Sequence, residues 1–192
     1  VPVFANIGGF SAEAIAAGVL AAEPYVEAVE ISLICPNVKP EGGFDEIALL
    51  RAVLARLEGR RKPVTVRIPN DTVRAPERLA ALVECCLDGG VAGLKVGAGR
   101  PVPEPRLGTG QGTLHGRAIF ADALTHVART AALTQGRIPI KGNGGVTSAA
   151  DVMAMQQAGA ACVDLFSAFV YEGWTIARDI NRGLRQGMPS HG

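Results

Sequence analysis

Apolar extended segments alternate with amphipathic segments along the whole chain. The extended segments are short and rich in Val, Ile and Leu, which predicts strands at residues 1–8, 26–34, 63–68, 92–97, 138–142 and 161–166. The segments between them carry apolar positions at helical spacing, which predicts helices at 11–24, 44–59, 76–90, 117–134, 148–159 and about 174–186. Residues 98–114 are rich in Gly and Pro and are expected to form a long loop. Six β/α units of this kind predict a parallel sheet covered by helices.

Two architectures fit this alternation, an open doubly wound sheet and a (β/α)8 barrel. No G-x-G-x-x-G follows the first strand, which argues against a dinucleotide-binding sheet. Gly-rich turns instead follow the last two strands, where barrels commonly bind phosphate. A complete barrel has eight units and about 250 residues. We therefore expect a TIM barrel of which this chain supplies about six units, as a single domain over residues 1–192 that lacks its first two units.

Composition and charge exclude several classes of protein. Hydrophobic residues make up 48% and charged residues 19% of the 192 residues, as in ordinary globular proteins. The net charge is +1, and the one short basic cluster, Arg60–Lys62, lies where a helix should end, so we expect no nucleic-acid partner. No apolar run approaches the roughly 18 residues of a membrane span. We expect a cytoplasmic protein without an integral membrane segment.

The four cysteines divide into two groups. Cys85, Cys86 and Cys162 fall in predicted helical or strand segments and are expected to be small core residues. No pair of cysteines has metal-ligand spacing, so we expect no metal site. Cys35 differs because it follows an apolar strand directly and precedes Pro36 in a turn. From the residues alone, Cys35 is either a structural cysteine or a thiol at the edge of a catalytic site.

The Gly-rich turns after the last two predicted strands are candidate phosphate sites. Gly144 and Gly145 form the first turn, and Phe166 and Ser167 begin the second. Backbone N–H groups in such turns can approach a phosphate closely, and a serine hydroxyl can donate to it. The alternative is that the glycines only form tight turns. Two such turns in succession favour a phosphate site.

Three stretches of the chain resemble one family. They are EISLICPNVK (30–39), GQGTLHGRAIFADAL (110–124) and IPIKGNGGVTSAADVMAMQQAGAACVDLFSAFVYEGW (138–174). The first is similar to E-L-N-x-S-C-P-N-V of the dihydroorotate dehydrogenase family, and the others to its G-G-L-S-G and P-I-I-G-x-G-G-I segments. The resemblance runs in register from Val1 to about Leu184 and aligns these six units with strands three to eight of the family barrel.

The resemblance implies an oxidoreductase of pyrimidine biosynthesis that oxidises dihydroorotate to orotate. FMN would accept the hydride and Cys35 would be the catalytic base. The cofactor-binding positions that the resemblance implies are Arg67, Gly116, Gly144, Gly145, Phe166 and Ser167. The substrate-binding positions are Ser32, Asn37, Ala98 and Gly99. The family also suggests a homodimer, whereas the electron acceptor, whether quinone, fumarate, NAD or oxygen, stays open.

Several positions depart from the family pattern, mostly where the pyrimidine is contacted. Ser32 and Ala98 each stand where the family has Asn, and Arg67 stands where it has Lys. His115 replaces a Ser, and Lys141 has an aliphatic counterpart and points either toward the flavin or to the barrel rim. FMN binding is therefore better supported than orotate specificity. The alternatives are an FMN-dependent oxidoreductase of another dihydropyrimidine-like substrate, or a non-catalytic phosphate-binding barrel fragment.

Overall fold

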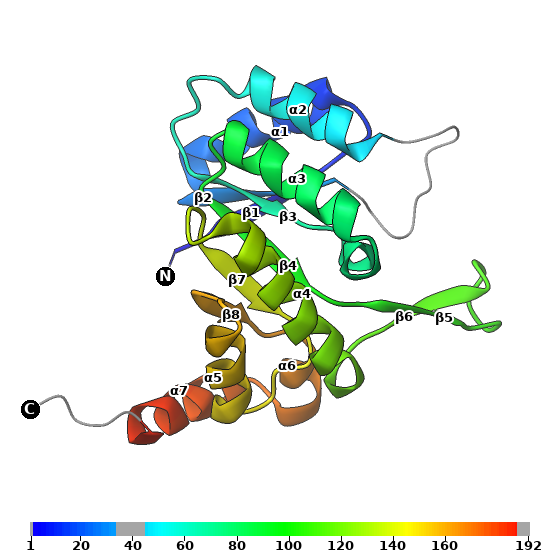
Figure 1. Ribbon diagram of the computed structural model, residues 1–192, viewed down its shortest axis with the longest axis vertical. Coiled ribbons are helices and arrows are strands. Elements are labelled where there is room, and N and C mark those ends of the chain that lie inside the picture. The colour runs from blue at the N-terminus through cyan, green and yellow to red at the C-terminus, as the bar shows by residue number, and fades with distance from the viewer. Residues whose placement is uncertain (1, 34–44, 188–192) are drawn as a thin grey trace, which may run out of the picture.

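The computed structural model describes residues 2–33 and 45–187. Six strands form one parallel sheet in the order β1-β2-β3-β4-β7-β8 (Figure 1). Their bounds are Phe4–Gly8, Ala28–Ser32, Val64–Arg67, Gly93–Gly97, Ile140–Asn143 and Cys162–Asp164. The helices are α1 (Ala12–Ala22), α2 (Glu46–Arg56), α3 (Pro76–Asp88), α4 (Phe120–Thr134), α5 (Ala149–Gln157), α6 (Ser167–Glu172) and α7 (Ile176–Gly187). The predicted alternation of six strands with helices is confirmed.

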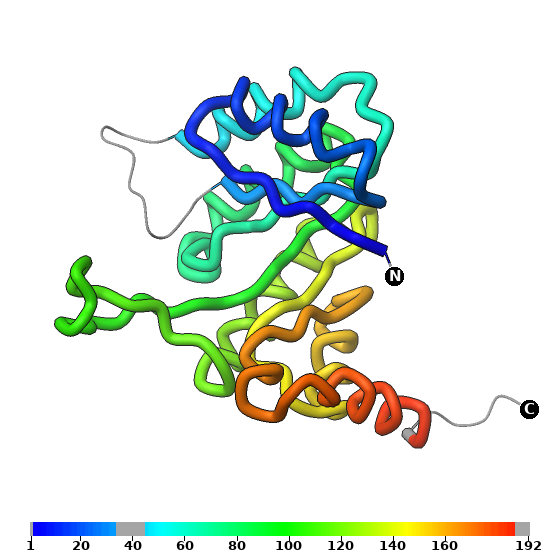
Figure 2. The backbone as a smooth tube through the Cα atoms, turned by 180° about the vertical axis from the view of Figure 1, so that it is seen from behind, coloured from blue at the N-terminus to red at the C-terminus, as the bar shows by residue number. Residues whose placement is uncertain are grey.

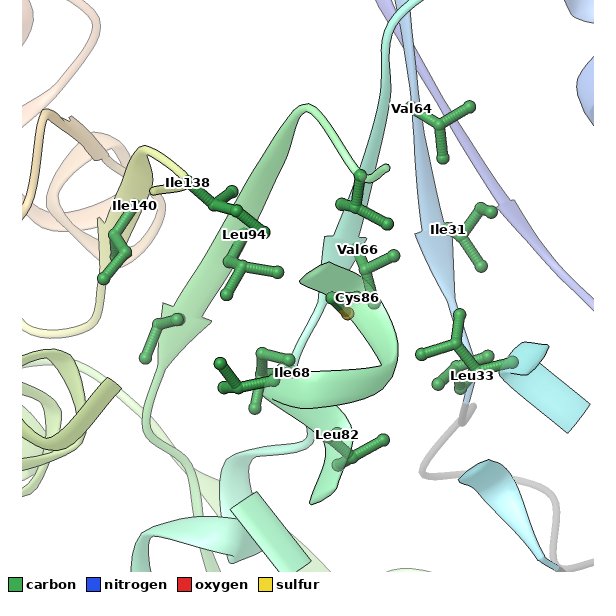
Figure 3. Close-up of a cluster of buried hydrophobic side chains, with 14 of the residues drawn as sticks. Ile31, Leu33, Val64, Val66, Ile68, Leu82, Cys86, Leu94, Ile138 and Ile140 are labelled. Carbon is green, nitrogen blue, oxygen red and sulfur yellow. The ribbon is translucent and has the colours of Figure 1, made fainter. Parts of the chain in front are cut away.

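One face of the sheet is apolar and is covered by helices. Side chains of successive strand residues point to opposite faces, so every second residue faces the helix layer. Ile31, Val66 and Leu94 lie on this face and are almost completely buried. Figure 3 shows them packed against Leu82 and Cys86 of α3. Each such side chain stabilises the fold by about 1.5–3 kcal/mol, so burial on this face holds sheet and helices together.

The other face of the sheet is polar. Glu30 and Lys141 alternate along their strands with the buried apolar residues. Arg67 of β3 is in register with Lys95 of β4, and Lys95 is in register with Lys141 of β7. In a closed barrel this face is the interior. In the described sheet, β1 and β8 are edge strands and do not pair with each other, so the sheet is open between them.

Residues 98–114 do not form the expected loop. They contain an antiparallel hairpin made of β5 (Arg100–Pro103) and β6 (Gln111–Leu114), with Arg100 paired to Leu114. The hairpin extends away from the body of the molecule in both views (Figures 1 and 2). Pro101 and Pro103 are tolerated because an isolated two-stranded ribbon leaves every second N–H without a strand partner. The Gly and Pro content therefore gave a wrong prediction of this segment.

The end of the chain also differs from the prediction. The strand predicted at 161–166 ends at Asp164, and the short helix α6 follows it before α7. Cys85 and Cys86 are buried in α3, as predicted, and burial raises the pKa of both thiols. The prediction that Cys162 is a core residue is wrong, because Cys162 is exposed. Cys162 is in register with Lys141 on the polar face of an edge strand, opposite the face that the described helices cover.

A buried histidine ties α4 to the end of β4. His126 is completely buried, and its Nδ1 donates to the carbonyl of Gly97 at 2.5 Å. Its Nε2 lies 2.8 Å from the hydroxyl of Thr72, in the short helix η2 (Asn70–Arg74). Burial lowers the pKa of His126, with a smaller contribution from Arg129, whereas the Gly97 bond and Asp71 act in the opposite direction. The neutral imidazole is thus the folded form.

The free energy of unfolding is expected to fall as the pH drops below about 6.5, the pKa of an unperturbed histidine. The unfolded chain then takes up a proton at His126 that the folded chain refuses, so stability is lost by up to about 1.4 kcal/mol per pH unit until the lowered folded pKa is reached. Urea unfolding between pH 5 and 8 measures this slope. The slope should be smaller in a His126→Gln variant and unchanged in His115→Gln, an exposed histidine. An equal slope in all three proteins contradicts the assignment.

Candidate functional site

A pocket of about 710 Å³ opens at the carboxyl ends of the strands. Arg67 ends β3, Asn143 ends β7 and Asp164 ends β8, and all three line it. The glycine turn that begins at Gly116 and the start of α6 at Ser167 complete the wall. The carboxyl ends of parallel strands are where β/α barrels place their active sites. The position of the pocket therefore matches a binding site.

Three glycines in this wall form a tight backbone cradle. Gly116, Gly144 and Gly145 have φ angles of +82°, +122° and +71°, which side-chain-bearing residues rarely adopt. A Cβ on Gly145 would lie 2.7 Å from the carbonyl oxygen of Gly116 and 3.0 Å from the Cβ of Phe120. A Cβ on Gly144 would lie 3.1 Å from the Cβ of Ala123. The two turns pack so closely that only bare backbone fits, and this backbone lines the pocket.

The second predicted turn lines the same pocket as the first. Phe166 precedes α6 and is 69% exposed, and Ser167 is the first residue of that helix. A Cβ on Gly116 would lie 3.8 Å from the Cβ of Ser167 and 4.0 Å from its hydroxyl oxygen. The Ser167 hydroxyl thus lies beside the glycine cradle. Bare backbone next to a serine hydroxyl suits an anionic group such as a phosphate.

Asp151 holds the first turn of α5 and an arginine of the pocket in place. Its carboxylate accepts from the backbone N–H groups of Thr147 and Ser148, both at 3.0 Å, and from Arg117 at 2.5 Å. Burial opposes its charged form, but Arg117 and the backbone donors outweigh burial and lower the pKa of Asp151. Arg117 also lies over the ring of Phe120, 4.5 Å from its centre. Because Arg117 is already paired with Asp151, it adds little free positive charge to the pocket.

The residues predicted to bind the cofactor all line this one pocket. They are Arg67, Gly116, Gly144, Gly145, Phe166 and Ser167. His115, which the sequence left open between an exposed and a functional residue, is exposed and lines the pocket as well.

The residues predicted to bind the substrate lie elsewhere or outside the description. The Ser32 hydroxyl accepts from Asn6 at 3.0 Å on the polar face of the sheet. Ala98 is 3% exposed and belongs to the core, and Gly99 follows it toward the hairpin. Cys35 and Asn37 lie outside the described residues.

A network of charges on the polar face was not anticipated. Lys141 donates to Glu30 at 2.8 Å, and Lys95 lies 2.6 Å from Asp164. The longer contacts, Lys95 to Glu30 at 3.5 Å and Lys141 to Asp164 at 3.8 Å, close the network. Burial of Lys141 opposes its charge, but Glu30 and Asp164 outweigh it and raise its pKa. Charged residues that alternate with apolar ones in E-I-S, L-K-V and I-K-G are the sequence signal that could have revealed the network.

Within residues 2–33 and 45–187, no helix combines the length and the apolar character that crossing a membrane requires.

The comparisons with known proteins agree with this architecture. The sequence profile described as dihydroorotate dehydrogenase matches residues 1–188. A protein of Cereibacter sphaeroides (strain KD131 / KCTC 12085) named dihydroorotate dehydrogenase (quinone) is 32% identical over 197 residues, which cover 96% of this chain and 55% of that protein. One of Deinococcus radiodurans with the same name is 34% identical and covers 95% of this chain and 54% of that protein.

The solved structures agree on the fold. A dihydroorotate dehydrogenase of Eimeria tenella in complex with ferulenol superposes with a TM-score of 0.77 at 20% identity, over 90% of this chain and 53% of that one. The TIM-barrel prediction is thereby confirmed for the six units present. The chain spans about half the length of the curated relatives it matches. With a family profile that matches residues 1–188, the chain belongs to the dihydroorotate dehydrogenase family.

Proposed function

We propose that the protein containing this chain is an FMN-dependent oxidoreductase that oxidises dihydroorotate to orotate. Family membership supports the reaction type, and the names of the curated relatives support the substrate. The observation that carries the proposal is the glycine cradle at Gly116, Gly144 and Gly145, which meets Ser167 in one pocket at the carboxyl ends of the strands.

The residues present fit FMN. The backbone at Gly144 and Gly145 and the hydroxyl of Ser167 line the same pocket and would hold the phosphate, because the N–H groups of a glycine turn can approach an anion closely. Arg67, at the end of β3, would bring a positive charge to the ring system. When bound, FMN supplies the hydride acceptor.

Cys35 would remove the proton that leaves with the hydride. It follows β2 by three residues, and the end of β2 pairs with the end of β3, where Ser32 is in register with Arg67. A thiol whose pKa suits the task acts as a general base for a carbon-bound proton at such a position. The end of β2 and the pocket lie at the same edge of the sheet.

Flavin absorbance of the purified full-length protein tests the proposal. We expect a yellow protein that bleaches when dihydroorotate is added in the absence of oxygen. A colourless protein that FMN cannot reconstitute contradicts it. The curated relatives carry quinone in their names, so a quinone is the first electron acceptor to assay. The homodimer also stays a prediction, which light scattering tests.

A Gly145→Ala variant is expected to bind FMN at least about tenfold more weakly. The new Cβ would meet the Gly116 carbonyl at 2.7 Å, and the φ of +71° adds strain of order 1–3 kcal/mol. Gly136→Ala is the matched control, because Gly136 has a φ of +75° but nothing within 4 Å of its Cβ position. Flavin content per protein measures the effect, and equal loss in both variants contradicts a specific role for the cradle.

A second candidate substrate has structural support. Ser32 and Ala98 carry no side-chain amide, and the Ser32 hydroxyl already accepts from Asn6, so neither replaces the amide that the resemblance implies for a pyrimidine ring. Another dihydropyrimidine is therefore the alternative substrate. Flavin that dihydrouracil bleaches and dihydroorotate does not would favour it.

A further inference from the structure

Two asparagine side chains flank the end of β4, where the chain runs Gly97–Ala98–Gly99. A Cβ on Gly97 would lie 2.9 Å from Oδ1 of Asn143 and 2.6 Å from its carbonyl oxygen. A Cβ on Gly99 would lie 2.8 Å from Nδ2 of Asn70. The absence of side chains at both glycines is what allows an amide to approach from each neighbouring strand end.

The two amides lie on opposite sides of the β4 end. Asn143 ends β7 and lines the pocket, and Asn70 begins η2, three residues after the end of β3. His115, which lines the pocket, has its Cε1 3.5 Å from the same Gly99 position that Asn70 approaches. Both asparagines are partly buried, and neither side chain makes a hydrogen bond to another residue of the described ranges. A partly exposed amide that no protein group occupies is free to bond a ligand.

The chemistry of the two amides selects the ligand. Each carries a carbonyl acceptor and an NH₂ donor, so a pair of them matches a ring edge on which C=O and N–H groups alternate. Between the two glycines, Ala98 is buried in the core and adds no polar side chain. A planar cyclic imide has this alternating edge and carries no charge there, so its recognition needs amides rather than cations.

We propose that Asn70 and Asn143 are the specificity-determining residues of this site and that they bind the imide edge of the substrate ring. The inference deepens the proposed function, on which its substrate class rests. It moves ring recognition from Ser32 and Ala98, where the sequence resemblance locates it, to the two asparagines beside the β4 end.

Calorimetric titration of the full-length protein with orotate and with uracil tests the inference, since both rings carry the imide edge. The Asn70→Ala and Asn143→Ala variants should each bind the ring about tenfold more weakly, because a truncated amide leaves a ring group unpaired. KM should rise by a similar factor. Asn181→Ala, on an exposed position of α7, is the matched control and should bind the ring like the parent protein.

Two further readouts separate recognition from a merely structural role. Asn143→Asp keeps the shape and the acceptor but removes the NH₂ donor, so it should also weaken ring binding while its melting temperature stays close to that of the parent. Unchanged ring affinity in both alanine variants, or a parent protein that binds neither orotate nor uracil, overturns the inference.

Flavin content keeps this result separate from the proposed function. A parent protein that lacks flavin but binds orotate through Asn70 and Asn143 sinks the proposed oxidoreductase and leaves the ring site standing. A yellow parent protein whose affinity for orotate and uracil does not change in the two asparagine variants leaves the proposed oxidoreductase standing and overturns the ring site.

Discussion

Replacing Cys35 with alanine is expected to lower the rate of flavin reduction by dihydroorotate about 100- to 10,000-fold, the usual contribution of a general base. The methyl group of alanine cannot accept the proton that must leave the substrate carbon. Flavin content should stay at the parent level, because the substitution leaves Gly144, Gly145 and Ser167, which would hold the phosphate, unchanged. Stopped-flow mixing without oxygen measures the reduction rate directly.

The other cysteines provide the control for this experiment. Cys162→Ala removes an exposed thiol on β8, so dihydroorotate should reduce the flavin of this variant at nearly the parent rate. The rate of flavin reduction in Cys35→Ser should lie between the rates of the parent and of Cys35→Ala. This rate should rise more steeply toward alkaline pH than that of the parent, because a hydroxyl is a weaker acid than a thiol. A Cys35→Ala protein that is reduced as fast as the parent would show that the proton leaves by another route.

The pattern of apolar residues was enough to predict the sheet and its helices. Burial recurs at every second residue in Val64 and Val66 of β3 and in Leu94 and Val96 of β4, and a local pattern of this kind survives in any fold that covers one face of a sheet. The hairpin at 100–114 escaped because Pro101 and Pro103 indicate a loop wherever the strand partner is unknown. Composition describes a segment, whereas pairing depends on a second segment.

The candidate site was predictable where glycine turns define it and where the family resemblance marks a position, as at Arg67 and Ser167. Gly144 and Gly145 were found because a tight turn needs glycine, whatever surrounds it. Asn70 and Asn143 were missed because their importance comes from the side chains missing at Gly97 and Gly99, on a different strand. Lys141 was noticed, but its partner Glu30 lies 111 positions earlier in the chain and only the fold brings them together.

A Glu30→Ala variant is expected to lose about 3 kcal/mol of unfolding free energy. Glu30 is 4% exposed and is the partner of Lys141, Lys95 and the amide of Asn6. Its removal leaves two partly buried ammonium groups with Asp164 as the remaining carboxylate of the network, and an uncompensated buried charge costs more than a lost contact. Urea unfolding at pH 7 measures the loss.

Glu13→Ala is the matched control for the loss of one carboxylate. Glu13 pairs with Arg56, but its side chain is 77% exposed, so its removal should cost less than about 1 kcal/mol. The dependence of the unfolding free energy on alkaline pH gives an independent check. Glu30 and Asp164 raise the pKa of Lys141, so the stability that this charge contributes is complete below about pH 10.5, the unperturbed value, and is lost as the pH rises through the folded pKa. The parent should therefore lose stability above pH 10.5 more steeply than Glu30→Ala. If Glu30→Ala and Glu13→Ala lose the same unfolding free energy and depend on alkaline pH in the same way, the charges on the polar face do not stabilise the fold. The apolar face alone then holds the six strands together.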